Sequence, residues 1–164
     1  MADGTHVEVR TSARVILIDP SDRVLLLAAR DPADQKVVWF VPGGGVEEGE
    51  SLEQAAKREL AEEVPLAGAL SLAGPIWTRH HDFSWAGHRV SQTEWFFVGR
   101  LATPLDAAAI SLDGAEAQFF AGARWATLAE LATWPDLLAP RRFRELLEPI
   151  LAGTLPPEPV DAGV

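Results

Sequence analysis

The sequence predicts a single domain of the α/β class, in which a mixed β-sheet packs with a small number of helices. Apolar segments of strand length alternate along the chain with one clear amphipathic helix and two shorter helical segments. Turn-forming residues separate these segments. A length of 164 residues with 48% hydrophobic content is enough for one core and short for two.

The elements follow from apolar periodicity and from the residues that interrupt it. Strands are expected at residues 13–18, 23–28, 39–41, 69–83, 89–101 and 123–126. Helices are expected at residues 52–64, 128–133 and 141–151. Ser51 and Gln54 have the spacing of a capping box at the start of the first helix, and Pro65 ends it.

The end of the chain differs in composition from the rest. Residues 155–164 are rich in proline and poor in core-forming side chains. We therefore expect one domain over residues 1–152 and a flexible tail over 153–164.

The net charge of −10, from 24 acidic and 14 basic residues, argues against non-specific binding to nucleic acid or to an anionic membrane. No run of eighteen apolar residues is present, and the first residues lack the pattern of a secretory signal. The chain has no cysteine, which excludes disulfides and thiolate metal sites and fits a cytoplasmic location. An anionic substrate would need a cation between itself and so acidic a protein.

The predicted helix at 52–64 carries carboxylates where an amphipathic helix should be apolar. At about 100° per residue, its apolar stripe consists of Leu52, Ala55, Ala56 and Leu60. Glu59 and Glu63 fall about 20° to either side of Leu52, and Glu62 lies at the edge of the stripe. Uncompensated carboxylates in a core cost several kcal/mol. The alternatives are a solvated face paired with neighbouring basic residues and a bound divalent cation, for which oxygen ligands favour Mg²⁺ or Mn²⁺.

Charge and backbone flexibility both concentrate around this helix. Residues 47–63 hold seven Glu against Lys57 and Arg58, a local net charge of −5. Three glycines at 43–45 precede this segment, and a glycine backbone can approach a metal ion or a phosphate closely.

These residues resemble the Nudix box, whose pattern is G-x5-E-x7-R-E-U-x-E-E-x-G-U. The matching positions are Gly44, Glu50, Arg58, Glu59, Leu60, Glu62, Glu63 and Leu66. Pro65 stands where the family has its second-last glycine, which changes how the helix ends but leaves the acidic positions intact. Residues 124–131 resemble a further segment frequent in the family, so the likeness extends over about residues 10–150.

The resemblance implies an α/β/α sandwich and an Mg²⁺- or Mn²⁺-dependent pyrophosphohydrolase that cleaves a diphosphate linkage in a nucleoside diphosphate derivative. Glu59, Glu62 and Glu63 would hold the ions, with a carbonyl of Gly43 or Gly44 as a further ligand. Arg58 would fix the carboxylates, and Glu50 would assist at the metal or orient Arg58.

The general base is not assigned by the box. Family members often use a glutamate from a later loop, which makes Glu116 the first candidate. Glu94, on a predicted strand, is the second.

Substrate-binding candidates come from the strands and loops expected to flank the site. Arg30 and Arg79 could reach phosphates, and Trp77 and Trp85 could stack on a base. Signatures of the diadenosine polyphosphate, coenzyme A and NADH subclasses are absent. Nucleoside triphosphates and nucleotide sugars remain by elimination.

Two other functions stay open. One is a nucleotide-binding or regulatory module that keeps the fold without turnover; the retained box carboxylates argue against it. The other is an RNA 5′-end hydrolase, against which the absence of a basic track argues. We expect a small nucleotide-type diphosphate as partner, no nucleic acid and no membrane, and leave a homodimer open.

Overall fold

The computed structural model describes residues 6–112 and 114–164, with only the backbone described at residues 114–116. Its strands are β1 (Val7–Ile18), β2 (Val24–Arg30), β3 (Val37–Phe40), β4 (Gly43–Gly45), β5 (Leu72–Trp85), β6 (His88–Arg100), β7 (Phe120–Ala126), β8 (Leu137–Leu138) and β9 (Val160–Asp161). Its α-helices are α1 (Leu52–Glu63), α2 (Leu128–Ala132) and α3 (Phe143–Leu151). Short 3-10 turns lie at Ala107–Ala109 and Gly114–Phe119.

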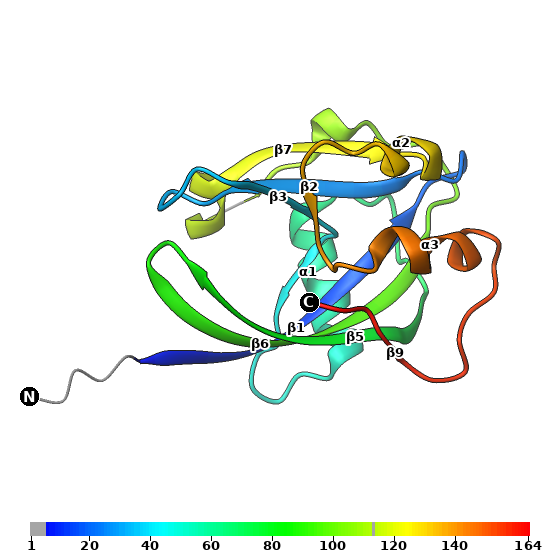
Figure 1. The fold of residues 1–164 in the computed structure, drawn as a ribbon. Coiled ribbons are helices and arrows are strands. Elements are labelled where there is room, and N and C mark those ends of the chain that lie inside the picture. The colour runs from blue at the N-terminus through cyan, green and yellow to red at the C-terminus, as the bar shows by residue number, and fades with distance from the viewer. Residues whose placement is uncertain (1–5, 113) are drawn as a thin grey trace, which may run out of the picture.

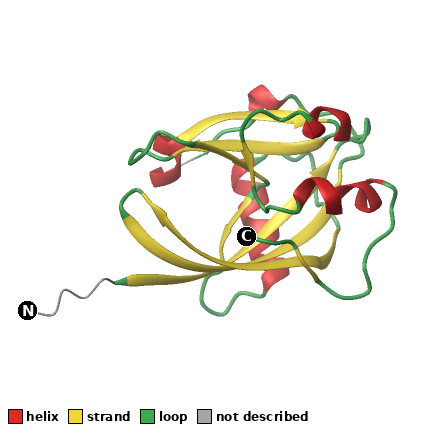
Figure 2. Cartoon of the chain, in the orientation of Figure 1, coloured by secondary structure: helices red, strands yellow, loops and turns green. Residues whose placement is uncertain are grey.

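The strands form one curled mixed sheet in the order β8-β3-β2-β1-β6-β5-β9, with β4 paired to β1 and β7 paired to β2. The parallel pairing of β1 with β6 runs along the whole of β1. β5 and β6 make a long curved hairpin, and β1 lies between this hairpin and β2 in the sheet (Figure 1). The mixed α/β fold class predicted from the sequence is confirmed, and strands outweigh helices (Figure 2).

Two hydrophobic clusters occupy the two faces of this sheet. α1 covers one face through Ala55, Ala56 and Leu60. α3 covers the other through Phe143 and Leu147. The alternation of side chains along β1 supplies both clusters, because successive residues of a strand point to opposite faces. The result is a sheet held between helices, with α1 fixed against the inner strands.

Local signals set the bounds of α1. Ser51 accepts a hydrogen bond from the Gln54 backbone N–H, and the Gln54 side chain accepts one from the Ser51 N–H. This reciprocal pair confirms the predicted capping box. The helix ends at Glu63, because Val64 before Pro65 takes an extended conformation.

The segment predicted to be a flexible tail is partly incorporated into the sheet. Val160 and Asp161 form β9 and pair with β5, and Ala162 is fully buried. The Ala162 N–H donates to the Thr78 carbonyl, and the Ala162 carbonyl accepts from the Arg142 N–H. Residues 160–162 therefore have backbone partners far away in the sequence, which their composition does not indicate.

No helix in the described part of the chain is both long and apolar enough to span a membrane.

Candidate functional site

The acidic face of α1 is buried, as the helical periodicity predicts. Glu59 and Glu63 are only 9% and 6% exposed. The Glu63 carboxylate accepts a hydrogen bond of 3.3 Å from the Gly43 N–H. The exposed Glu62 lies at the edge of this face. The two central carboxylates are thus turned toward β4 and not toward solvent.

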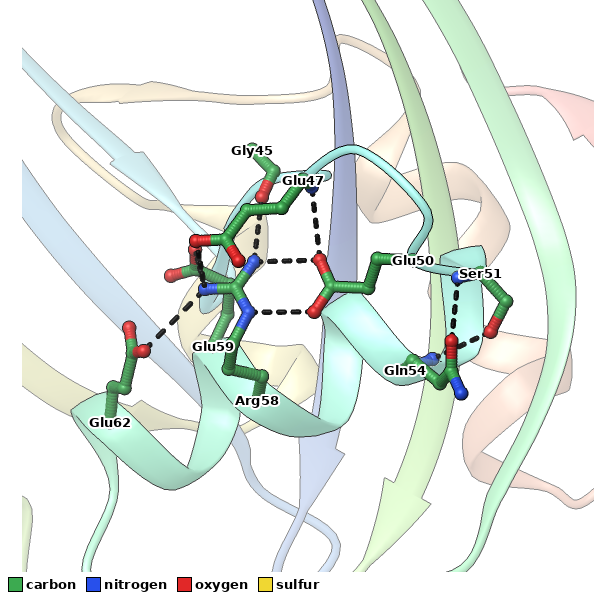
Figure 3. Close-up of polar contacts among 8 residues, drawn as sticks. All are labelled: Gly45, Glu47, Glu50, Ser51, Gln54, Arg58, Glu59 and Glu62. Carbon is green, nitrogen blue, oxygen red and sulfur yellow. Dashed lines mark hydrogen bonds and ion pairs between the residues drawn. The ribbon is translucent and has the colours of Figure 1, made fainter.

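Arg58 organises the carboxylates around α1 (Figure 3). It binds Glu50 through two parallel hydrogen bonds, of 2.7 Å from Nε and 2.9 Å from Nη2. Nη2 also donates to the Gly45 carbonyl, and Nη1 donates to Glu59 at 2.9 Å and to Glu62 at 3.5 Å. One guanidinium therefore ties α1 to the loop before it and to β4.

This arrangement shifts the ionisation of both partners. The hydrogen bond from Arg58 is the main cause that lowers the pKa of Glu50 to about 2. The hydrogen bond to Glu50 in turn raises the pKa of Arg58 above its ordinary value. Both groups are charged throughout the physiological range.

The three glycines before α1 form a strand that is not among the strands predicted from the sequence. β4 pairs antiparallel with β1 from Ser12 to Arg14. A Cβ on Gly43 would lie 2.3 Å from the Ala13 carbonyl oxygen, and φ at this residue is +149°. A Cβ on Gly44 would lie 2.5 Å from the carboxyl carbon of Glu59. Only glycine lets this backbone lie against both β1 and the Glu59 carboxylate.

The donor set here suits a hard divalent cation. Carboxylates of Glu59, Glu62 and Glu63 and carbonyls of the glycine strand are all oxygen donors, and no cysteine competes. The close approach of Gly44 to Glu59 brings carbonyl and carboxylate together. Among the residues described, no three acidic or histidine side chains are already gathered in a geometry that would hold a metal ion. The residues present fit such an ion, with side-chain adjustment on binding.

A cleft of about 750 Å³ opens beside this site. Gly43, Gly44 and Glu63 line it at the glycine strand, and the β5–β6 hairpin supplies a wall with His81 and Phe83. Glu63 and the glycines thus face the same space as the hairpin. A ligand in this cleft can touch both.

A buried charge cluster lies in the wall of the cleft. Glu94 accepts from Arg14 Nε at 2.7 Å and from Arg79 Nε at 2.8 Å, and His81 Nε2 lies 3.0 Å from the same carboxylate. Arg14 also donates to the Gly43 carbonyl at 3.2 Å. These charges lower the pKa of Glu94 despite its burial. Arg14 therefore connects the glycine strand to the cleft wall.

Sequence reasoning missed Arg14, although a signal for it exists. Arg14 interrupts an apolar strand between Ala13 and Val15. A charge inside such a run is rarely buried without a partner, so it marks an ion pair or a site.

The predicted substrate residues separate into two groups. Arg79 and Trp85 line the cleft, and the Trp85 ring makes an edge contact with Phe119. Trp77 is 1% exposed and packs in the core against Phe96 and Phe143. Its burial removes it from the candidates for base stacking, because no face of the ring is accessible.

Arg30 lies outside the described lining of the cleft. It is exposed at the end of β2 and donates to the Gln35 carbonyl. The side chain of Glu116, the first candidate for the general base, lies outside the described residues.

Comparison with known proteins gives consistent relatives. A family model described as the NUDIX domain matches residues 8–147. An RNA pyrophosphohydrolase of Caulobacter vibrioides is 30% identical, with 93% of this chain and 89% of the relative aligned. A putative 8-oxo-dGTP diphosphatase of Bacillus subtilis is also 30% identical, over 82% of this chain and 75% of the relative. The structure of the E. coli dihydroneopterin triphosphate pyrophosphohydrolase shares the fold, with a TM-score of 0.63, 24% identity, and coverage of 90% of this chain and 99% of that one.

Proposed function

The chain belongs to the Nudix family and is a hydrolase of phosphoanhydride bonds, and from this premise we propose that it is an Mg²⁺- or Mn²⁺-dependent pyrophosphohydrolase of a nucleoside diphosphate derivative. The observation that carries the proposal is the burial of Glu59 and Glu63 against the glycine strand, where Glu63 and the glycines also line the cleft. Arg58 donates to Glu59 and the Gly43 N–H donates to Glu63, which holds both carboxylates beside the glycine strand. Nucleoside triphosphates and nucleotide sugars are the proposed substrates.

The proposed metal ligands are Glu59, Glu62, Glu63 and a carbonyl of Gly43 or Gly44. When bound, the ions would neutralise phosphate charge and activate water. Arg58 holds Glu50 and Glu59 in fixed orientations through charge-assisted hydrogen bonds.

Arg14 and Arg79 supply positive charge on the cleft side of this site. Glu94 holds both guanidiniums, and both arginines line the cleft. We assign them to the orientation of substrate phosphates, a role for which the planar donor fork of arginine is suited.

Glu116 remains the first candidate for the general base. Glu94 already accepts from two guanidiniums, and its lowered pKa makes it a weak base. The contacts of Glu94 support a role in positioning Arg14 and Arg79.

The test is release of phosphate or pyrophosphate from a panel of nucleoside triphosphates, nucleotide sugars and dinucleotides, with Mg²⁺ and with EDTA. We expect cleavage of one group in Mg²⁺ and none in EDTA. Cleavage that persists in EDTA would contradict the metal requirement. Silence across the whole panel, with metal still bound, would favour the binding or regulatory module.

Metal binding has a readout that does not need turnover. Mg²⁺ that binds only the folded protein stabilises it by about 2.7 kcal/mol at 100 times its dissociation constant. We expect Mg²⁺ to raise the melting temperature of the wild type, and Glu63→Gln to reduce this increase and lower turnover by orders of magnitude. Equal increases in both proteins would remove Glu63 from the ligands.

A second candidate substrate is the 5′-triphosphate end of RNA. The Caulobacter vibrioides relative carries the name RNA pyrophosphohydrolase, whereas the net charge of −10 argues against a long polynucleotide. Short 5′-triphosphate RNA in the same panel distinguishes this substrate from small nucleotides.

A cytoplasmic location, which the lack of cysteine favours, and a homodimer are further expectations. Fractionation tests the location, and light scattering tests the oligomeric state.

A further inference from the structure

The floor of the cleft carries a polar side chain without a protein partner. Gln92 on β6 is 3% exposed and lines the cleft. Within the part of the chain that the structure describes, no group forms a hydrogen bond with its carboxamide, whereas its neighbour Glu94 has three charged or polar partners. The Gln92 carboxamide does not belong to the fully enclosed polar atoms without a partner, so it reaches the open space of the cleft. It is therefore available to bind what enters the cleft.

The sheet register shows what surrounds this amide. Gln92 lies opposite His81 on β5 and opposite Arg10 on β1. Directly opposite residues share one face of a sheet, so all three side chains face the cleft. The charged or titratable side chains next to Gln92 on this face are therefore Arg10, His81 and Glu94.

Aromatic rings stand beside the amide on the same wall. His81 and Phe83 stack with their centroids 4.5 Å apart and an angle of 16° between the rings. Trp85 follows two residues further along β5 and contacts Phe119. These rings line the cleft and offer flat apolar surfaces. Stacking of a base on an aromatic side chain contributes about 1–3 kcal/mol.

We propose that Gln92 reads the hydrogen-bonding edge of a nucleobase bound against the aromatic wall of this cleft. A glutamine carboxamide offers one acceptor and two donors in one plane, which complements a base edge with a donor beside an acceptor. The inference rests on the proposed function, because it names the part of the nucleotide that lies away from the metal ligands. Gln92 is thus a specificity-determining residue and takes no part in bond cleavage.

A binding experiment on the intact protein tests this role. Calorimetric titration with AMP, GMP, CMP and UMP is compared with titration by ribose 5-phosphate, which lacks the base. We expect Gln92→Leu to weaken the tightest nucleotide by about 10- to 100-fold. Its affinity for ribose 5-phosphate should not change. Gln118→Leu, at an exposed position outside the described lining of the cleft, is the matched control and should leave both affinities intact.

Stability distinguishes recognition from a structural role. Because the amide has no protein partner to lose, Gln92→Leu and the longer Gln92→Met should keep or raise the unfolding midpoint while they weaken nucleotide binding. If Gln92 had a structural role, the substitutions would lower both the unfolding midpoint and the affinity for the nucleotide.

Three results would overturn the proposal. The first is an equal loss of affinity for the nucleotide and for ribose 5-phosphate in Gln92→Leu. The second is an unchanged nucleotide affinity in both Gln92→Leu and Gln92→Met. The third is a wild type that binds no mononucleotide more tightly than ribose 5-phosphate. Nucleotide binding that depends on Gln92 in a protein without Mg²⁺-dependent hydrolysis would instead support the inference and reject the proposed function.

Discussion

Arg58 keeps the Glu50 carboxylate ionised at pH values where an ordinary glutamate is protonated. The pKa of Glu50 falls from 4.5 to about 2 in the folded protein. A depressed pKa stabilises the folded state fully above the unfolded pKa, and this contribution is lost as the pH falls toward the folded pKa. We expect the stability difference between wild type and Glu50→Gln to be largest above about pH 5 and to vanish near pH 2. Urea unfolding of wild type and Glu50→Gln across this pH range measures the stability difference. A difference that does not change with pH would contradict the pairing.

Glu94 is the residue on which the charge cluster depends. Glu94→Gln removes the carboxylate that pairs with the buried Arg79 and the half-buried Arg14, and breaking a buried pair costs about 3–5 kcal/mol. We expect a lower free energy of unfolding and a raised KM with a smaller change in kcat. Asp82→Asn, at an exposed carboxylate on the same hairpin, is the control and should have little effect. Unchanged stability with a large loss of kcat would instead make Glu94 the general base.

At the scale of elements, β4 decides whether the carboxylates of α1 can approach the backbone. In Gly44→Ala the new methyl group would lie 2.5 Å from the Glu59 carboxyl carbon, so Glu59 must move. In Gly45→Ala no atom outside the adjacent residues lies within 4 Å of the new methyl group. We expect Gly44→Ala to lower turnover at least tenfold and to weaken the stabilisation by Mg²⁺, while Gly45→Ala keeps both. Activity and melting temperature, with and without Mg²⁺, measure this pair. Equal behaviour of the two variants would show that the contact of Gly44 with Glu59 is not used.

Elements with local signals could be predicted from the sequence, and those that depend on distant partners could not. The helix at 52–64 was expected to within one residue of α1, because Ser51, Gln54 and Pro65 mark its ends locally. The glycine strand was not among the expected strands, because only its pairing with β1 defines it. The two residues of β9 have no strand pattern of their own and are defined by β5.

The same limit applies to the candidate site. The acidic face of α1 could be predicted, because the helical period places Glu59 and Glu63 together. The cluster of Arg14 and Glu94 joins residues eighty positions apart, through the parallel pairing of β1 with β6. Trp77 was expected to stack on a base. It lies on the same face of β5 as Arg79 and His81, but at a point where Phe143 of α3 packs against it, so it is buried in the core. Which part of a sheet face is covered depends on elements that are distant in the sequence.

At the scale of the whole molecule, the last residues join the sheet to the layer that contains α3. Ala162 is fully buried, with its N–H on Thr78 of β5 and its carbonyl on the Arg142 N–H, just before α3. Ala162→Asp would place a charge without a partner in this junction, at a cost of several kcal/mol. Val164→Asp, two residues further along at a position 62% exposed, is the matched control.

We therefore expect Ala162→Asp to lower the urea midpoint strongly and Val164→Asp to change it little. Loss of β9 also removes the bond from Arg142 Nη1 to the Asp161 carbonyl, so α3 and β5 should be destabilised together. Amide hydrogen exchange measures this joint destabilisation. In the Ala162→Asp variant we expect faster exchange in α3 and β5 and unchanged exchange in α1. Equal urea midpoints for the two variants would show that residues 160–162 form the loose tail that their composition predicts. Faster exchange confined to β9 would show that the segment lies on the sheet without joining it to α3.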